Sequence, residues 1–203
     1  MSKRPGVEVG HLPVTAFGSR DPLWWGVVAL ICVESMMFAL LWVTYFFMRG
    51  NESQWPPTSL SNHTLRLAFL NLALLLLSCL TMLWVNAGTK TGRLRTMRQG
   101  MWAGALMGAL ILVVRGLELA SLDFRWDSHG YGSVFWVLLG LHTMHAVAGT
   151  AENLMLLALL YTGPIEEKHL PDLRVNSLYW FFMVGSWLVT FCILFLDPAV
   201  WRA

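Results

Sequence analysis

Charged residues are scarce in this sequence. Asp, Glu, Lys and Arg make up 13% of its 203 residues, roughly half of their usual share in soluble proteins. The 14 basic residues nearly balance the 12 acidic ones, which gives a formal net charge of +2. DNA- or RNA-binding surfaces need clustered positive charge. The composition therefore excludes a nucleic-acid partner.

Cysteine is also rare. Cys32, Cys79 and Cys192 have neither the spacing of a disulfide framework nor that of a zinc site. All three lie in apolar runs, so they are expected to be small buried hydrophobic residues. Covalent cross-links and structural zinc are therefore not expected to stabilise the fold.

Hydrophobic residues are abundant instead, at 56% of the chain, and the mean hydropathy is +0.57. A helix needs roughly 20 apolar residues to cross about 30 Å of hydrocarbon. Five runs have that length, which predicts an all-α integral membrane bundle of five transmembrane helices. The predicted spans are about 23–48, 65–85, 101–122, 133–161 and 175–196.

The links between these runs are short and polar, so the sequence predicts a single membrane domain over residues 23–203, preceded by an N-terminal tail over residues 1–22. This tail lacks the apolar segment of a signal peptide. The tail and the second and fourth links carry nine Lys and Arg residues, against five elsewhere. Basic segments stay in the cytoplasm. The N-terminus is therefore predicted to be cytoplasmic and the C-terminus to lie on the outer, periplasmic side.

Ionisable residues within the spans are costly in a membrane and must face protein, a partner or water. On the fourth span, His142, His145, Gly149 and Glu152 are spaced three, four and three residues apart, which places them on one helix face. On the third span, Gly104 and Gly108 are a small-residue pair that permits close helix packing. The candidate buried polar residues, some of them related to proton transfer, are Glu34, Arg115, Glu118, His142, His145 and Glu152.

Two interpretations of these residues remain open. Glu34 lies about midway along the first span and could exchange protons as part of a protonatable network. Alternatively, a contact between Glu34 and His145, and a pair formed by Arg115 and Glu118, could fix the helix packing without any chemistry. The sequence alone supports both interpretations.

His142 and His145 also raise the possibility of a metal or haem site, because imidazoles three residues apart share a helix face. Membrane haem b normally takes its two axial histidines from different helices, whereas these two lie on one. Zinc or copper would need further ligands, and no cysteine or carboxylate motif supplies them. We therefore predict no metal and no catalytic residue in this chain.

Taken together, several motifs give the sequence a family resemblance. Their order and spacing cover nearly everything after the N-terminal tail and resemble subunit III of cytochrome c oxidase, in its five-helix form. The motifs are Glu34 with Phe38, Gln54-Trp55-Pro56-Pro57, Asn71 with Trp84, Glu118, Tyr131-Gly132-Ser133, Gly140 to His145 with Gly149, and Tyr179-Trp180 with Trp187.

The resemblance implies an accessory subunit without haem or copper, in a proton-translocating cytochrome c or quinol oxidase. Its partners would be the haem–copper catalytic subunit I and subunit II, which carry the haem and copper, and phospholipid bound between helices. In this family the carboxylate matched by Glu34 is linked to proton uptake, and Glu118 and His145 match other polar positions. A bacterial-type inner membrane is the expected location.

The chain also departs from the family pattern. Phe181 and Val184 replace two polar residues of the last helix, whereas Arg115 and Glu152 add charge elsewhere. We hypothesise that these added charges compensate for the lost ones, so that Glu152→Leu lowers the stability of the complex. The same departures leave open a subunit III-like protein of a nitric oxide reductase. A small transporter and a haem b membrane anchor are the remaining alternatives.

The second link is basic and is expected to lie at the inner membrane surface. Clustered basic residues there attract anionic lipid headgroups. A five-helix bundle that lacks two helices of the seven-helix form also leaves one flank open for lipid. The predicted headgroup residues are Arg93, Arg95 and Arg98, and control of topology is the alternative role of this link.

Overall fold

The computed structural model of the chain describes residues 22–162 and 170–197. Within these ranges all regular structure is helical, and five helices are long and apolar enough to cross a membrane. The prediction of an all-α bundle with five spanning helices is thus confirmed. The helices are α1 (Pro22–Asn51), α2 (Asn62–Thr91), α3 (Leu94–Ala120), α4 (Gly130–Thr162) and α5 (Leu170–Phe191), which continues into the π-helical turn Cys192–Leu196.

The helices contain the predicted spans with one exception. The third span was expected to reach Leu122, but α3 ends at Ala120. The N–H of Leu122 donates to the Leu119 carbonyl three residues back, instead of to the carbonyl four residues back as in an α-helix. The predicted N-terminal tail, apart from Pro22, lies outside the described residues, as do residues 163–169 of the fourth link.

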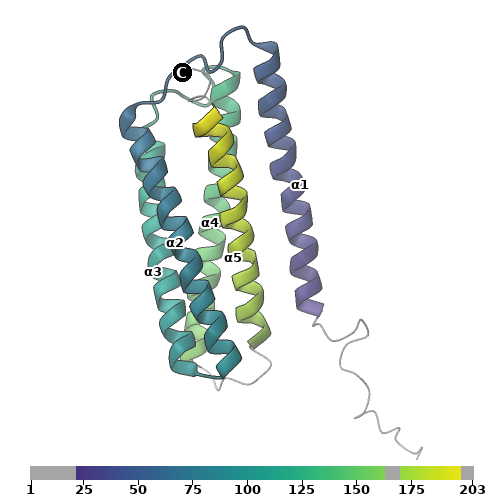
Figure 1. The fold of residues 1–203 in the computed structure, drawn as a ribbon, viewed down its shortest axis with the longest axis vertical. Coiled ribbons are helices and arrows are strands. Elements are labelled where there is room, and N and C mark those ends of the chain that lie inside the picture. The colour runs from purple at the N-terminus through teal and green to yellow at the C-terminus, as the bar shows by residue number, and fades with distance from the viewer. Residues whose placement is uncertain (1–21, 163–169, 198–203) are drawn as a thin grey trace, which may run out of the picture.

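Consecutive helices run antiparallel (Figure 1), and local sequence explains where they turn. The hydroxyl of Ser61 caps α2 by accepting a hydrogen bond from the Thr64 N–H at 3.2 Å. Gly92 ends the same helix with a φ of 64°, a left-handed conformation that glycine adopts without steric cost. This tight turn places α3 directly against α2.

Glycines set the distances between α2, α3 and α4. A Cβ atom on Gly100 would lie 2.7 Å from Val85 Cγ2, and one on Gly108 would lie 2.5 Å from Thr150 Oγ1. A Cβ atom on Gly104 would lie 2.7 Å from Met82 Cε, so the close packing expected from Gly104 and Gly108 is present. Only a residue without a side chain allows the backbones to approach this closely.

The core lies between α2, α3, α4 and α5, while α1 stands at the edge of the bundle (Figure 1). Phe38 and Tyr45 are the only buried residues of α1. Trp180 and Trp187 of α5 fill the centre and are both almost fully buried. Because α1 contacts only α4 and α5 extensively, its outer face is left to lipid or a partner.

The cysteine prediction is wrong in part. Cys32 and Cys192 are exposed on the bundle surface, and Cys79 is partly buried. An apolar run in a membrane helix does not distinguish a face that meets lipid from one that meets protein, since both are hydrophobic.

Candidate functional site

A polar contact between three helices surrounds Glu34 of α1. The hydroxyl of Tyr179 on α5 donates a hydrogen bond to Glu34 Oε1 at 3.2 Å. His145 Nε2 on α4 lies 3.4 Å from Glu34 Oε2. The Glu34 and His145 side chains are only 15% and 10% exposed, so this carboxylate is held mainly by protein groups.

The hydrogen bond of His145 to its own helix decides which ring nitrogen faces Glu34. His145 Nδ1 lies 2.7 Å from the Leu141 carbonyl, which accepts a hydrogen bond from it. Nε2 is therefore the nitrogen that faces the Glu34 carboxylate. Glu34 Oε2 has no hydrogen-bond partner among the described residues, so its 3.4 Å separation from Nε2 is a close approach of two ionisable groups rather than a hydrogen bond.

A cavity of about 330 Å³ adjoins Glu34 between α1, α4 and α5. Glu34, Glu152 and Tyr179 supply its polar lining, and Val27, Leu30, Ala148 and Val175 supply its apolar walls. The two carboxylates therefore share one cavity. Within the described part of the chain, Glu152 forms no ion pair.

The second polar cluster is separate and lies deeper in the bundle. Arg115 Nη1 donates to Glu118 Oε2 at 2.8 Å, and the two side chains are 1% and 0% exposed. The Arg115 guanidinium also lies over the Trp187 ring, 3.8 Å from its centroid. The ring of His142 lies 4.5 Å from the same tryptophan. Arg115 is thus stabilised by a carboxylate and an aromatic face together.

His142 and His145 share a helix face but have different partners. His142 Nε2 donates to the Met183 carbonyl at 3.3 Å, whereas His145 contacts Glu34. Among the described residues, no group of three or more His, Cys, Asp and Glu side chains is arranged to hold a metal ion. Both imidazoles are therefore engaged by neighbouring protein groups.

Of the predicted lipid residues, Arg98 has a partner inside the chain. Its Nε and Nη2 donate to the Leu160 carbonyl of α4 at 2.9 and 2.7 Å. Its guanidinium also lies 4.6 Å from the centroid of the Tyr161 ring. Arg93 and Arg95 are exposed at the turn between α2 and α3. The predicted headgroup residues thus divide into Arg98, which packs against α4, and two exposed cations, Arg93 and Arg95.

Sequence reasoning missed two polar contacts. Asp197, just after the last span, accepts a hydrogen bond from Tyr45 Oη at 3.2 Å and pairs with Arg49, which joins the end of α1 to the end of α5. Asn176 Nδ2 donates to Asn153 Oδ1 at 2.7 Å in the core. Asp197 lies at the end of a span, and Asn153 and Asn176 are uncharged, so neither contact involves an ionisable residue inside a span. The presence of two amide side chains within apolar spans is the sequence signal that indicates the second contact.

The chain is similar to known proteins over nearly its whole length. The model of the family described as "Cytochrome c oxidase subunit III" matches residues 10–199. "Cytochrome c oxidase subunit 3" of Alkalihalophilus pseudofirmus is 28% identical, with 80% of this chain and 81% of that protein covered. The protein of the same name from Thermostichus vulcanus is 25% identical, with 84% and 85% covered. The one from Mus musculus is 25% identical, with 91% and 72% covered.

Proposed function

The chain belongs to the cytochrome c oxidase subunit III family, and from this premise we propose that it is a non-redox accessory subunit of a respiratory haem–copper oxidase. It supports the catalytic subunit I and assembles with subunit II, and these partners carry the haem and copper. It resides in the inner membrane of a bacterial-type cell. The supporting observation is that His142 and His145 are both engaged by protein groups, Met183 and Glu34, rather than converging on one point.

The experiment is purification of the chain from its native membrane in mild detergent, with a reduced-minus-oxidised spectrum recorded with and without carbon monoxide. We expect a haem-bearing, carbon monoxide-reactive subunit to co-purify. The haem signal should be lost when the two chains are separated. The haem type and the partner then distinguish a cytochrome c oxidase, a quinol oxidase and a nitric oxide reductase. A chain that purifies without a partner would contradict the proposal. If this isolated chain is colourless, a transporter would be favoured, and if it carries haem colour, a haem b membrane anchor would be favoured.

We further propose that Glu34 supports proton uptake by the assembled oxidase. Two ionisable groups support this proposal, because His145 Nε2 lies 3.4 Å from Glu34 Oε2 and Glu34 lines a cavity of about 330 Å³. Proton exchange needs a titratable group and access to water, and the cavity provides space for water. Glu152 lines the same cavity and adds a second carboxylate along its wall.

Glu34→Gln tests this role. The amide keeps an oxygen that accepts from Tyr179 but removes the proton exchange. We expect proton pumping per electron to fall while the amount of assembled, haem-containing complex stays unchanged. Tyr179→Phe is the matched control, since it removes one hydrogen bond and leaves the carboxylate in place. If both variants pump normally, or if Glu34→Gln reduces only assembly, Glu34 has a structural role alone.

A further inference from the structure

The buried polar cluster around Trp187 holds more hydrogen-bonding atoms than its own side chains pair. Arg115 and Glu118 form one hydrogen bond, from Nη1 to Oε2. Arg115 Nη2, Glu118 Oε1 and Trp187 Nε1 are left without a hydrogen-bond partner among the described residues. These three side chains are at most 1% exposed, so solvent outside the bundle does not reach them.

Two further acceptors come from α2 and α4. Asn71 Nδ2 donates to the Ile111 carbonyl at 3.4 Å, so the other amide atom, Oδ1, is an acceptor. His142 Nε2 donates to the Met183 carbonyl, so Nδ1 of the neutral ring is also an acceptor. Both acceptors are buried, and neither has a partner within the described part of the chain.

These five atoms belong to one cluster, to which α2, α3, α4 and α5 all contribute. The Arg115 guanidinium and the His142 ring both lie against Trp187, and the Asn71 side chain lies beside Glu118. Donors and acceptors thus occur together, yet none of the five atoms forms a hydrogen bond with another. Polar groups in such an arrangement are bridged by water.

The mixture of donors and acceptors determines the kind of ligand. Arg115 Nη2 and Trp187 Nε1 are donors, whereas Glu118 Oε1, Asn71 Oδ1 and His142 Nδ1 are acceptors. An anion would satisfy the donors and meet three acceptors. A metal cation would satisfy the acceptors and meet the Arg115 charge. Water accepts and donates, and buried water typically forms about three hydrogen bonds to groups of this kind.

We propose that this cluster is a binding site for buried water. A water molecule accepts hydrogen bonds from Arg115 and Trp187 and donates to acceptors such as Glu118 Oε1. It thereby completes the solvation of the Arg115–Glu118 pair inside the membrane, which the protein groups alone leave incomplete. The site lies within the core of this chain, so it is independent of the proposed oxidase assembly.

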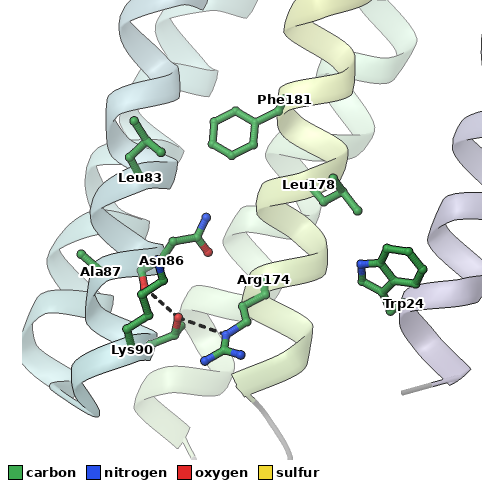
Figure 2. Close-up of a pocket in the computed structure, with 9 residues that line it drawn as sticks. Trp24, Leu83, Asn86, Ala87, Lys90, Arg174, Leu178 and Phe181 are labelled. Carbon is green, nitrogen blue, oxygen red and sulfur yellow. Dashed lines mark hydrogen bonds between the residues drawn. The ribbon is translucent and has the colours of Figure 1, made fainter. Parts of the chain in front are cut away.

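Asn86 of α2 differs from this cluster. Its Oδ1 also lacks a partner among the described residues. However, Asn86 lines a groove of about 670 Å³ between α2, α5 and the start of α1, and its side chain points toward the space between α2 and α5 (Figure 2). Larger molecules reach a groove from outside the bundle. The cluster around Trp187 is fully buried, which favours the smallest polar ligand.

X-ray radiolytic footprinting of the purified protein in mild detergent tests the site. X-rays convert bound water into hydroxyl radicals, which oxidise the side chains beside it. Trp180 is the matched control, because it also lies on α5, is 1% exposed, and already donates from Nε1 to Ser78 Oγ at 2.8 Å. We expect Trp187 to be oxidised several times faster than Trp180, as measured by mass spectrometry of peptides. Equal rates would overturn the proposal.

A radical scavenger in the buffer identifies the source of the radicals. Trp126 is 63% exposed and is oxidised by radicals from bulk water. The scavenger should suppress the oxidation of Trp126 and leave that of Trp187 unchanged, since radicals from bound water react where they form. Equal suppression of both would mean that Trp187 is reached from outside, and the proposal would be wrong.

Removal of the ion pair should reduce the bound water. Arg115→Met with Glu118→Leu removes an unpaired donor and an unpaired acceptor without leaving a single buried charge. We expect oxidation of Trp187 to fall severalfold. Arg125→Met with Asp127→Leu is the charge-matched control at an exposed pair and should leave that rate unchanged. Equal rates in the two double variants would overturn the proposal. If the Arg115 variant does not fold, the comparison of Trp187 with Trp180 in the unmodified protein decides.

Discussion

At the scale of single residues, the Arg115–Glu118 pair shows how a charge is kept inside this bundle. Both side chains are almost fully buried, and Arg115 also lies over the Trp187 ring. A buried ion pair is weak evidence for net stabilisation of the fold. Removal of one partner, however, leaves the other charge buried without a counter-charge, which is strongly destabilising.

Glu118→Gln should therefore be more harmful than loss of the whole pair. We expect the single substitution to destabilise the protein by about 3–5 kcal/mol, because Arg115 loses its counter-charge. The double variant Arg115→Gln with Glu118→Gln should recover a large part of that loss. The measurement is the melting temperature of the purified complex in a double-mutant cycle. Additive losses would show that the two charges are not coupled.

Glu152 presents the opposite case, a carboxylate without a cation in the described part of the chain. It shares a cavity with Glu34, and Asp172 is a nearby like charge. If Glu152 compensates for the polar groups missing from the last helix, its counter-charge must come from a partner or a lipid. We therefore expect Glu152→Leu to lower the melting temperature of the assembled complex but not that of the isolated chain. An unchanged melting temperature of the complex would refute the compensation hypothesis.

At the scale of helices, small residues decide how closely α3 and α4 pack. Gly108 has no room for a Cβ atom, since Thr150 Oγ1 would lie 2.5 Å away. Gly116 lies on the same helix with no atom within 4 Å of its ideal Cβ position. Helix α3 thus contains one glycine without room for a side chain, Gly108, and one with open space around its Cβ position, Gly116.

Alanine substitutions at these two glycines should have opposite effects. Gly108→Ala is expected to destabilise the bundle by about 1–3 kcal/mol, because α4 must move away to relieve the overlap. Gly116→Ala is expected to be neutral or stabilising by up to about 1 kcal/mol, because alanine favours helix. Thermal unfolding of both variants in the same detergent makes the comparison. Similar losses would mean that helix packing does not explain the Gly108 position.

At the scale of the whole molecule, α1 is attached to the other four helices by a few polar contacts. Glu34 meets Tyr179 and His145 near the middle. Trp42 Nε1 donates to Thr190 Oγ1 at 3.1 Å further along. Asp197 joins Tyr45 and Arg49 at the end. Because α1 buries so few apolar side chains, these contacts determine how firmly it is held.

Asp197→Ala should loosen the end of α1. We expect faster amide hydrogen exchange over residues 40–51, since the charged hydrogen bonds lost there are each worth about 1.5–3 kcal/mol. Asp127→Ala is the control. It also removes a carboxylate from an arginine pair, but the Arg125 and Asp127 side chains are 79% and 45% exposed, and exposed pairs contribute little. Equal exchange in the two variants would mean that α1 is held by apolar packing instead.

The sequence by itself determined the number of helices, their approximate spans and the family. Transfer of a helix into a membrane depends on the summed hydrophobicity of about 20 successive residues, which can be read along the chain without knowledge of its neighbours. The family follows from motifs whose order and spacing can be read directly along the sequence. The contact of Glu34 with His145 could be predicted as a hypothesis from the sequence. Two ionisable side chains at a similar depth in the membrane are each unfavourable in contact with lipid, and a contact between them lowers that free-energy cost.

The tertiary structure decided which of the possible polar contacts form. His142 and His145 share a helix face, yet one bonds to the Met183 carbonyl and the other to Glu34. Asp197, just after α5, accepts a hydrogen bond from Tyr45 of the neighbouring helix α1, although the two residues lie far apart in the sequence. In a membrane, the faces that meet lipid are as apolar as those that meet protein. The sequence pattern therefore does not reveal how each helix is rotated, and the rotation determines every contact between helices.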